Sequence, residues 1–406
     1  MLRLARMRIF RGTTLVAVTA IGVAVSCLGM TMIELGYHSR ILAVRNVQDI
    51  SARCAADAGM ADAIFMMNKK LIDEPVWDNG TLPSRTDIAL PNSLSKFTYS
   101  VTGSQATGFE IVSTGTCGTA QKSVHVLLNV GSYLQGVGVK ETADIFRGAT
   151  LGTDPPGSPI GMIVRTNSIA TDALKFKAFV TVPGDVLCGP GGITADVVDT
   201  KATTVIKGST YAAAEKLEFP LPVPPSGLPA GPNMPTTVGE SVTLTPGAYQ
   251  YAGITLPNSS QLKISGDTVI YVVGPIIFNK DAQLIVESTG SLKLYLGTSL
   301  EDKNATGISG IFNNTNSSNN LRIYGCAGSE DAPMDIDLKA KSTLYAAIYA
   351  PNADIDLFNS GDFHGAIVGY SFEMKNSGNL YYDTSLATAL IDSPEACFIV
   401  GHWWED

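Results

Sequence analysis

The sequence predicts a mixed fold: one long amino-terminal α-helix that spans a membrane, a small antiparallel sheet, and an all-β solenoid similar to a parallel β-helix. Three observations predict it. Residues 13–33 carry no charge and follow a short leader that contains four arginines. Residues 97–130 contain three runs in which apolar and polar side chains alternate. Beyond residue 242, segments repeat after about twenty residues, which is typical of stacked β-coils.

The uncharged run is long enough to cross a bilayer. At about 1.5 Å per residue its helix measures about 32 Å, and a hydrocarbon core is about 30 Å thick. The side chains expected to anchor it in lipid are Leu15, Val16, Val18, Ile21, Val23, Val25, Leu28 and Ile33. The arginines before the run favour a cytoplasmic amino terminus. We therefore expect a single pass through the bacterial inner (cytoplasmic) membrane. The chain after Glu34 is then extracytoplasmic, and a location at the cell surface is compatible with this topology.

Two other fates of this run stay open. A secretory signal peptide has a shorter apolar core and is cleaved at a small-residue site. The segment Ala24–Cys27 also imitates a lipoprotein site. Because the apolar run continues beyond Cys27 to Ile33, retention as an anchor is favoured.

Composition, charge and cysteine spacing exclude several functions. A chain of 406 residues has room for two or three domains. Its net charge is −9 and no face rich in lysine and arginine follows the leader, so nucleic acid is excluded as a partner. The six cysteines form no CxxC pair, which argues against zinc and redox motifs. A disulfide between Cys326 and Cys397 and buried free thiols are both compatible with the sequence.

The helix is expected to follow the leader (residues 1–11) and to cover residues 12–74. Only Gly36 interrupts the stretch from Glu34 to Val44, and Pro75 ends the helix. Apolar and small residues recur at helical spacing and predict a stripe that packs against a sheet or another helix: Val44, Val47, Ile50, Cys54, Ala58, Ala61 and Phe65.

Residues 75–135 predict an antiparallel meander with one apolar face. Its alternating runs are KFTYSV, FEIVS and SVHVLLNV, and the turns between them are rich in glycine. The stripe on the preceding helix is expected to be what this sheet covers.

The amino-terminal region resembles PilX-type minor pilins of type IV pilus systems. The resemblance is carried by Arg11–Val16, by the uncharged run, and by Ala55–Gly59 followed by Met60 and Asn68. It implies a candidate processing site between Gly12 and Thr13 and partners that are other pilin-like subunits. A major type IV pilin has a glutamate five residues into the mature chain, whereas Ala17 occupies that position here.

The remaining two thirds predict stacked β-structure in two parts. Residues 136–218 form a first β-rich segment, residues 219–238 a proline-rich connector, and residues 239–395 the solenoid. The segment starting at Ile254 repeats from Ile276, a period of 22 residues that aligns Gln261 with Gln283. Leu357–Gly361 returns as Met374–Gly378, a period of 17. A β-sandwich is the alternative, because it also has short alternating strands.

The segments Ile348–Ala353, Gly365–Gly369 and Leu380–Asp383 resemble the DUF7305-type carboxyl-terminal domain, which is often fused to PilX-like anchors in bacteria. This resemblance implies a solenoid-like domain without an established activity. The tail, residues 396–406, contains Trp403 and Trp404, which are expected to cap the last coil.

The residues that could carry chemistry are acidic: Asp335, Asp337, Asp354, Asp356 and Asp362. Residues two apart on a strand share a face, so two stacked pairs could bind Ca²⁺ or cleave a polysaccharide. The favoured interpretation is that Ile336 and Ile355 point inward and the aspartates are the solvated face. His364 beside Asp362 could be a base with its orienting partner, but no nucleophile elbow or HExxH motif occurs. We expect no catalytic, cofactor-binding or metal-binding residue.

The sequence therefore predicts a non-enzymatic, pilin-like envelope protein that is related to type IV pili or pseudopili and displays its solenoid outside the membrane. A surface adhesin that binds glycans and an anchored enzyme that acts on polysaccharides are the alternatives.

Overall fold

The chain folds into two compact units. The computed structural model describes residues 10–74, 77–302, 309–338, 343–358, 361–375 and 378–405, without the side chains of residues 10–15. Unit 1 takes its residues from 1–67, 78–129 and 400–406, and unit 2 from 68–77 and 130–399. Unit 2 is therefore inserted into the sequence of unit 1.

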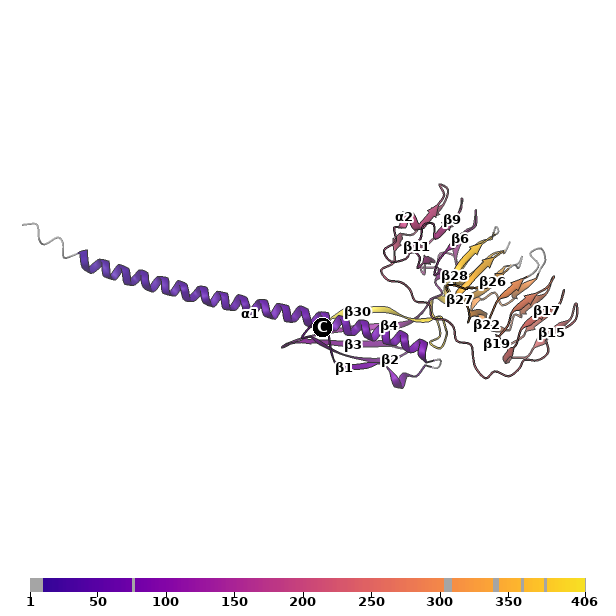
Figure 1. The fold of residues 1–406 in the computed structure, drawn as a ribbon, viewed down its shortest axis with the longest axis horizontal. Helices are drawn as coiled ribbons and strands as arrows, with labels where there is room; N and C mark the ends of the chain where they lie inside the picture. The colour runs from indigo at the N-terminus through magenta and orange to yellow at the C-terminus, as the bar shows by residue number, and fades with distance from the viewer. Residues whose placement is uncertain are drawn as a thin grey trace, which may run out of the picture. The chain divides into compact units, whose positions relative to one another are not determined.

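One long helix, α1 (Phe10–Asp73), begins the described chain and runs without interruption (Figure 1). It contains a segment that is long and apolar enough to span a membrane, and none of that segment is buried. The prediction of one long, apolar amino-terminal helix is confirmed.

Unit 1 contains a five-stranded sheet in the order β1, β2, β3, β4, β30. Its strands are β1 (Ser84–Ala89), β2 (Lys96–Ser104), β3 (Gly108–Cys117), β4 (Ala120–Ser132) and β30 (Ala396–Glu405), with a short 3₁₀ helix, η1 (Asn79–Thr81), before β1. The pairs from β1 to β4 are antiparallel, as the alternating runs predicted. Alternate side chains such as Phe97, Phe109 and Val126 are buried between the sheet and α1.

The helix meets this sheet through its smallest residues. Ala52, Ala55, Ala56, Gly59 and Ala63 recur at helical spacing and are buried. The Ser113 hydroxyl on β3 donates a hydrogen bond to the Ala56 carbonyl at 2.8 Å. A Cβ atom on Gly115 would run into the backbone of Ala52 and Ala56, so helix and strand approach almost backbone to backbone.

The predicted packing stripe is therefore wrong as the face that covers the sheet. Val44, Val47, Ile50 and Phe65 are 50–64% exposed. Cys54 and Ala61 are also exposed, and Ala58 is half-buried. The physical reason is the close approach at Gly115, which leaves room for alanine and glycine but for no larger side chain.

The tail prediction is also wrong. Trp403 and Trp404 lie in β30, next to β4 in the sheet of unit 1, and cap no coil. The Trp404 ring stacks on His125 of β4, with the ring centroids 5.2 Å apart.

Unit 2 consists of short strands in two runs of the chain. The first run holds β5 (Gly136–Val139), β6 (Ala143–Ile145), β7 (Leu151–Asp154), β8 (Ile163–Thr166), β9 (Leu174–Phe176), β10 (Thr181–Val182), β11 (Asp185–Cys188), α2 (Thr194–Val197), β12 (Val198–Thr200), β13 (Val205–Ile206) and β14 (Thr210–Ala212).

The second run holds β15 (Ser241–Leu244), β16 (Gly247–Tyr251), β17 (Ile254–Leu256), β18 (Gln261–Ile264), β19 (Asp267–Val272), β20 (Ile276–Phe278), β21 (Gln283–Val286), β22 (Ser291–Leu296), β23 (Leu300–Asp302), β24 (Gly310–Asn313), η2 (Ser318–Asn320), β25 (Leu321–Gly325), β26 (Met334–Leu338), β27 (Leu344–Leu357), β28 (Phe363–Met374), β29 (Leu380–Asp383) and η3 (Thr384–Ala387).

The strands of unit 2 pair in parallel, which does not fit an antiparallel sandwich. The repeats predicted from the sequence lie in register. Ile254 pairs with Ile276 and Gln261 with Gln283, which confirms the period of 22. Leu357 pairs with Met374 as the period of 17 requires, while the corner residues 359–360 and 376–377 lie outside the described residues.

One ladder of strands shows how the chain is threaded. Its order is β14, β11, β8, β5, β28, β27, β25, β22, β19, β16. The chain enters at β5 in the middle, moves to one end at β14, and crosses to the other end. It then returns from β16 to β28, beside β5. The segments 136–218 and 239–395 thus contribute to one sheet of 19 strands.

Inward-pointing side chains form one apolar core along these ladders. Leu262, Leu284 and Ile311 stack on neighbouring strands and are at most 1% exposed. Each strand buries its inward residues against the strands before and after it, so the core is as long as the stack.

The connector covers an outward-pointing column of tyrosines. Tyr271, Tyr295, Tyr324 and Tyr349 lie in register on β19, β22, β25 and β27. The Tyr349 hydroxyl donates to the Pro220 carbonyl at 2.9 Å, and Phe219 is buried. Farther along, Ala230 pairs with Gln250 of β16. The predicted extended connector is thus a strap over one outer face of unit 2.

Candidate functional site

The predicted anchor residues lie on an unpartnered part of α1. Among those whose side chains are described, exposure ranges from 60% to 74%: Val16, Val18, Ile21, Val23, Val25, Leu28 and Ile33. The side chains of Leu15 and of the candidate processing pair Gly12 and Thr13 lie outside the described residues. So much exposed apolar surface is unfavourable in water and needs lipid or protein to cover it.

The exposed apolar surface continues beyond the predicted membrane span. Leu35, Tyr37, Leu42, Val44, Val47 and Ile50 are 50–70% exposed. The helix from residue 13 to residue 50 is about 57 Å long, nearly twice the thickness of a hydrocarbon core. Lipid can therefore cover only part of this surface at one time.

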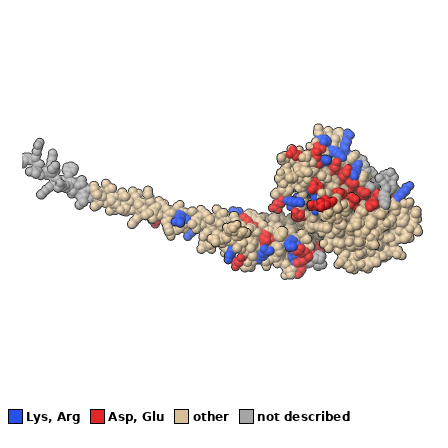
Figure 2. Space-filling view, in the orientation of Figure 1, with Lys and Arg blue, Asp and Glu red and all other residues tan. Residues whose placement is uncertain are grey.

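The acidic candidates of unit 2 form rows on its outer face. Asp335 pairs in register with Asp354, and Asp337 with Asp356. The intervening Ile336 and Ile355 are buried, as strand alternation predicted. The same face carries further acidic side chains, and Figure 2 shows them gathered on the visible side of this unit.

The second row extends across the junction of the two runs. Asp356 pairs with Glu373 on β28, and Glu373 with Asp144 on β6. Successive members of such a row are about 4.8 Å apart. The sequence missed this extension, because Asp144 precedes Glu373 by more than two hundred residues.

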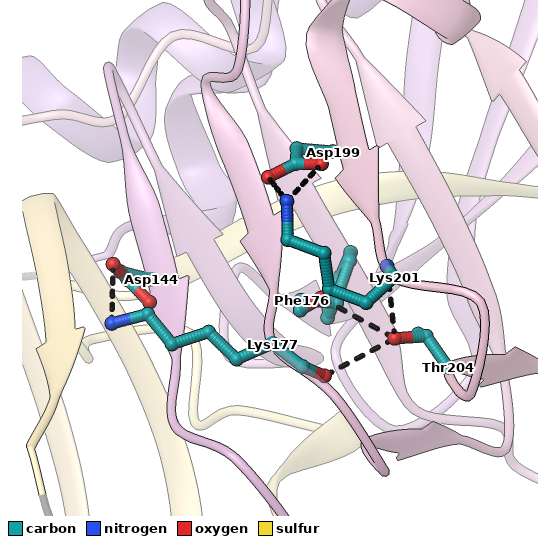
Figure 3. Close-up of polar contacts among 6 residues, drawn as sticks. All are labelled: Asp144, Phe176, Lys177, Asp199, Lys201 and Thr204. Atoms are coloured by element: carbon teal, nitrogen blue, oxygen red, sulfur yellow. Dashed lines mark hydrogen bonds and ion pairs between the residues drawn. The ribbon is translucent and has the colours of Figure 1, made fainter.

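Lysines neutralise much of the row. Lys375 Nζ lies 2.6 Å from Asp356 Oδ2 and 3.2 Å from Glu373 Oε2. Lys177 Nζ lies 3.0 Å from Asp144 Oδ2, and Lys201 Nζ lies 2.8 Å from Asp199 Oδ2 (Figure 3). The row of Asp356, Glu373 and Asp144 therefore ends among lysine side chains, where positive and negative charges alternate.

Thr204 ties the two lysine-bearing turns together. Its hydroxyl lies 3.1 Å from the Lys177 carbonyl and 3.3 Å from the Phe176 carbonyl (Figure 3). The same oxygen accepts a hydrogen bond from the Lys201 backbone N–H at 3.3 Å. These contacts join the turn after β9 to the turn after β12.

The first row contains a carboxyl group whose charged form is disfavoured. The Ser371 hydroxyl donates to Asp354 Oδ1 at 2.5 Å, while burial and then the carboxylates of Asp354 and Asp337 raise the pKa of Asp335. Asp335, Asp354 and Ser371 line an open groove of about 440 Å³ together with Lys175 and Lys375. Within the described ranges, no three side chains of the His, Cys, Asp or Glu type are placed to hold a metal ion.

Asp362 is not the partner of His364, contrary to the pairing considered from the sequence. Asp362 Oδ1 accepts hydrogen bonds from the backbone and side-chain amides of Asn379, at 3.3 and 2.9 Å. His364 Nδ1 lies 2.7 Å from Asp154 Oδ2 instead. Asp154 is 210 residues away in sequence, so only the pairing of β29 with β7 could have revealed it.

The His364 ring is stacked between two tyrosines. Its centroid lies 4.5 Å from that of Tyr345 and 4.9 Å from that of Tyr381. Tyr381 in turn lies over Gly152, where a Cβ atom would come within 2.7 Å of the ring. This aromatic column packs the junction between the two runs of unit 2.

All six cysteines are free thiols, so no disulfide joins Cys326 and Cys397. Burial raises the pKa of each of these two thiols to about 12. They behave as small buried apolar groups.

In the comparison with known proteins, one family model matches part of the chain. Residues 192–389 match the model of DUF7305, a domain of unknown function. The match starts within the first run of unit 2 and ends after β29, so it spans the strap and most of the parallel strands.

The crystal structure of the competence-associated pilin ComZ from Thermus thermophilus aligns with 88% of this chain and 98% of its own. The identity is 11% and the TM-score is 0.24, which is too low to establish a common fold. No curated protein sequence matches the chain.

Proposed function

We propose that this protein is a non-enzymatic, pilin-like subunit of a type IV pilus-related assembly. The amino-terminal helix anchors it in the inner membrane with its amino terminus in the cytoplasm. The inserted unit 2 is then a β-solenoid displayed outside the membrane. Its parallel ladders, repeat periods of 22 and 17 residues, and single elongated core support this interpretation.

The observation that carries the proposal is the length of the exposed apolar face of α1. Val44, Val47 and Ile50 lie beyond the part that a bilayer can cover, yet they remain at least half exposed. Such a face is stable outside lipid only when another apolar surface covers it. A neighbouring helix of the same kind is the simplest cover, and it implies assembly with other pilin-like subunits.

The resemblance to PilX-type minor pilins supports processing between Gly12 and Thr13. Residues Ala55, Ala56 and Gly59 of the resembling block are the ones that contact the sheet of unit 1. The block therefore has a structural reason to be made of small residues.

Site-specific photo-crosslinking in the native cell tests the assembly. A photoreactive residue at Val47 should give adducts with a second pilin-like polypeptide, whereas the same residue at the exposed loop position Gln105 should not. Adducts no stronger than those at Gln105 would contradict the proposal. Mass spectrometry of the mature amino terminus tests processing: a start at Thr13 supports it, and a start at Met1 or Cys27 rules it out.

A second proposal is a glycan-binding adhesin, and the acidic groove beside Asp335 and Asp354 is the observation that favours it. A glycan array probed with the full chain tests it, with Asp354→Asn as the variant. Binding that Asp354→Asn abolishes would support an adhesin, and cleavage of any glycan would indicate an enzyme instead.

A further inference from the structure

A cavity of about 470 Å³ lies between the strap and the tyrosine column of unit 2. All of its lining residues belong to this unit. Its size is in the usual range for ligand sites. Tyr133 and Tyr295 contribute aromatic side chains, Pro222, Pro224 and Pro225 contribute rings from the strap, and the end of α1 contributes Leu71.

The cavity exists because the strap is longer than the distance it covers. From Tyr349 on β27 to Gln250 on β16 the ladder advances by four strand spacings, about 19 Å. The strap bridges this distance with residues 220–230, which would extend over about 31 Å as a straight polyproline II segment. A bend at Ser226 and Gly227, where φ of Gly227 is positive, takes up part of the excess length. The excess length bows away from the strands, and Val223 is 70% exposed at the bow.

One tyrosine hydroxyl of this face, and a second at the end of the stack, already bind carbonyl groups of the strap. Tyr251 lies one residue beyond Gln250, which is the β16 member of the tyrosine column. Tyr349 donates to the carbonyl of Pro220 at 2.9 Å, and Tyr251 donates to that of Pro232 at 3.2 Å. In both contacts a tyrosine hydroxyl donates to a proline carbonyl of an extended segment, and aromatic-lined grooves are the surfaces that bind polyproline segments. The molecule thus contains its own example of such a ligand.

The hydroxyls of Tyr133 and Tyr295, beside the same face, donate to no carbonyl group of the strap in the described part of the chain. Among the described residues, neither the Tyr133 nor the Tyr295 side-chain hydroxyl has a hydrogen-bond partner. Burial raises the pKa of both phenols, so both stay neutral donors. Both residues line the cavity, so a ligand carbonyl placed there can accept a hydrogen bond from each hydroxyl.

The charges at the cavity favour a neutral ligand. Asp73 Oδ2 is paired with Lys69 Nζ at 2.6 Å, and Glu74 is paired with Lys70. Asp392 Oδ1 accepts a hydrogen bond from the Trp77 backbone N–H at 2.8 Å. Since each carboxylate at the rim has a partner, no strong field selects a cation.

We propose that this cavity binds a neutral, proline-rich segment of a partner protein in the polyproline II conformation. Tyr133 and Tyr295 donate hydrogen bonds to its carbonyl groups, as Tyr349 does to Pro220. The site shares no residue with the membrane anchor or with the acidic groove. A failure of peptide binding would therefore leave the function proposed above untouched, and the reverse also holds.

Fluorescence anisotropy with a labelled decaproline peptide and the full chain in detergent micelles tests this site. The peptide should bind saturably, whereas a glycine-serine peptide of equal length should not. Tyr133→Phe and Tyr295→Phe each remove only a hydroxyl and should weaken binding by about 3- to 10-fold. Tyr345→Phe, on a different outer column, is the matched control and should bind like the unmodified chain.

Decaproline that binds no better than the glycine-serine peptide would overturn the proposal. Equal affinity of the unmodified chain and both Phe variants would do the same, and so would an equal loss in Tyr345→Phe.

Discussion

Glu395 lies fully buried and holds the segment before β30 against the tyrosine face of unit 2. Its carboxylate is paired with Arg322 and accepts a hydrogen bond from the Tyr324 hydroxyl at 3.0 Å. The guanidinium also donates to Asn319 Oδ1 at 2.6 Å. A buried pair of this kind is satisfied only as a whole, because removing one member leaves the other charge in a dry environment.

Replacing Glu395 by Gln should therefore destabilise unit 2 by about 3–5 kcal/mol, because it leaves Arg322 buried without its counter-charge. Urea denaturation followed by circular dichroism measures this. Glu330, which is 63% exposed and lies 3.7 Å from Lys140 Nζ, provides the control, and Glu330→Gln should change stability by less than about 1 kcal/mol. Equal effects of the two substitutions would show that burial of the pair is unimportant.

Asp335 makes the stability of unit 2 depend on pH. Its pKa is raised above the ordinary value of 3.8, first by burial and then by the carboxylates of Asp354 and Asp337. The folded state thus binds this proton more tightly than the unfolded state. The resulting stability is present below about pH 3.8 and is lost as the pH rises through the folded-state pKa.

At pH 7, Asp335→Asn should stabilise unit 2 by up to about 1 kcal/mol, because it removes one charge from the row and solvent screens the rest. At pH 3.5 the gain should shrink. Lys375→Met should have the opposite effect at pH 7, since it deprives Asp356 and Glu373 of their shared cation. Denaturation curves at both pH values check the signs, and a gain that is independent of pH would contradict the assignment.

At the scale of residues, alternation predicted correctly which side chains of β26 and β27 point inward. The partners of charged residues could not be predicted in the same way. Asp154 reaches His364, and Asp144 reaches Glu373, only because two distant runs of the chain lie side by side. Register along one strand is local information, whereas pairing between strands depends on the whole topology.

At the scale of elements, α1 combines two faces with different requirements. The face toward the sheet is made of alanine and glycine from Ala52 to Ala63, with Met67 buried beyond them, and the opposite face carries most of the other large apolar side chains. The length of this helix could be predicted because no proline interrupts it before Pro75. Its buried face could not, because large side chains were expected to be buried, whereas the glycines on β3 and α1 select small ones.

Gly115→Val should destabilise unit 1 by about 1–3 kcal/mol or more, because its side chain would run into the backbone of α1. Gly36→Ala is the control on the same helix: nothing lies within 4 Å of a Cβ atom there. It should be neutral or slightly stabilising, because alanine favours helix more than glycine does. Thermal unfolding in detergent micelles compares the two, and a harmless Gly115→Val would contradict the close approach.

Val18→Asp should weaken insertion of α1 by about 2.5–3.5 kcal/mol, because it places a carboxylate in the predicted hydrocarbon core. Val47→Asp makes the same change outside that span and should leave insertion unaffected. Separation of membrane and soluble fractions measures both. If the two variants distribute identically, residues 13–33 are not the anchor.

At the scale of the whole molecule, one unit is inserted into another. The antiparallel strands β1 to β4 come first, the parallel strands of unit 2 follow, and β30 returns to the first sheet. The resemblance and the repeats predicted a pilin-like start and a stacked β-region. They did not predict that β30 pairs with β4, because the apolar tail was interpreted as a cap on the last coil.

The threading of unit 2 was also beyond prediction. Clear repeats occur only between Ile254 and Val286 and between β27 and β28, whereas the first run shows no repeat that aligns with them. Inward positions there require only an apolar residue of suitable size, so different sequences can extend one stack. The proline-rich connector was recognised, but nothing in it indicates that it crosses the outer face to the far end.

The account depends most on α1 being a membrane anchor that holds the rest of the chain outside. Protease added to intact spheroplasts tests this directly. We expect the protease to remove the chain beyond residue 34 while a short fragment with residues 13–33 remains in the membrane. Full protection of the chain until the spheroplasts are lysed, or its recovery in the soluble fraction without detergent, would contradict the account.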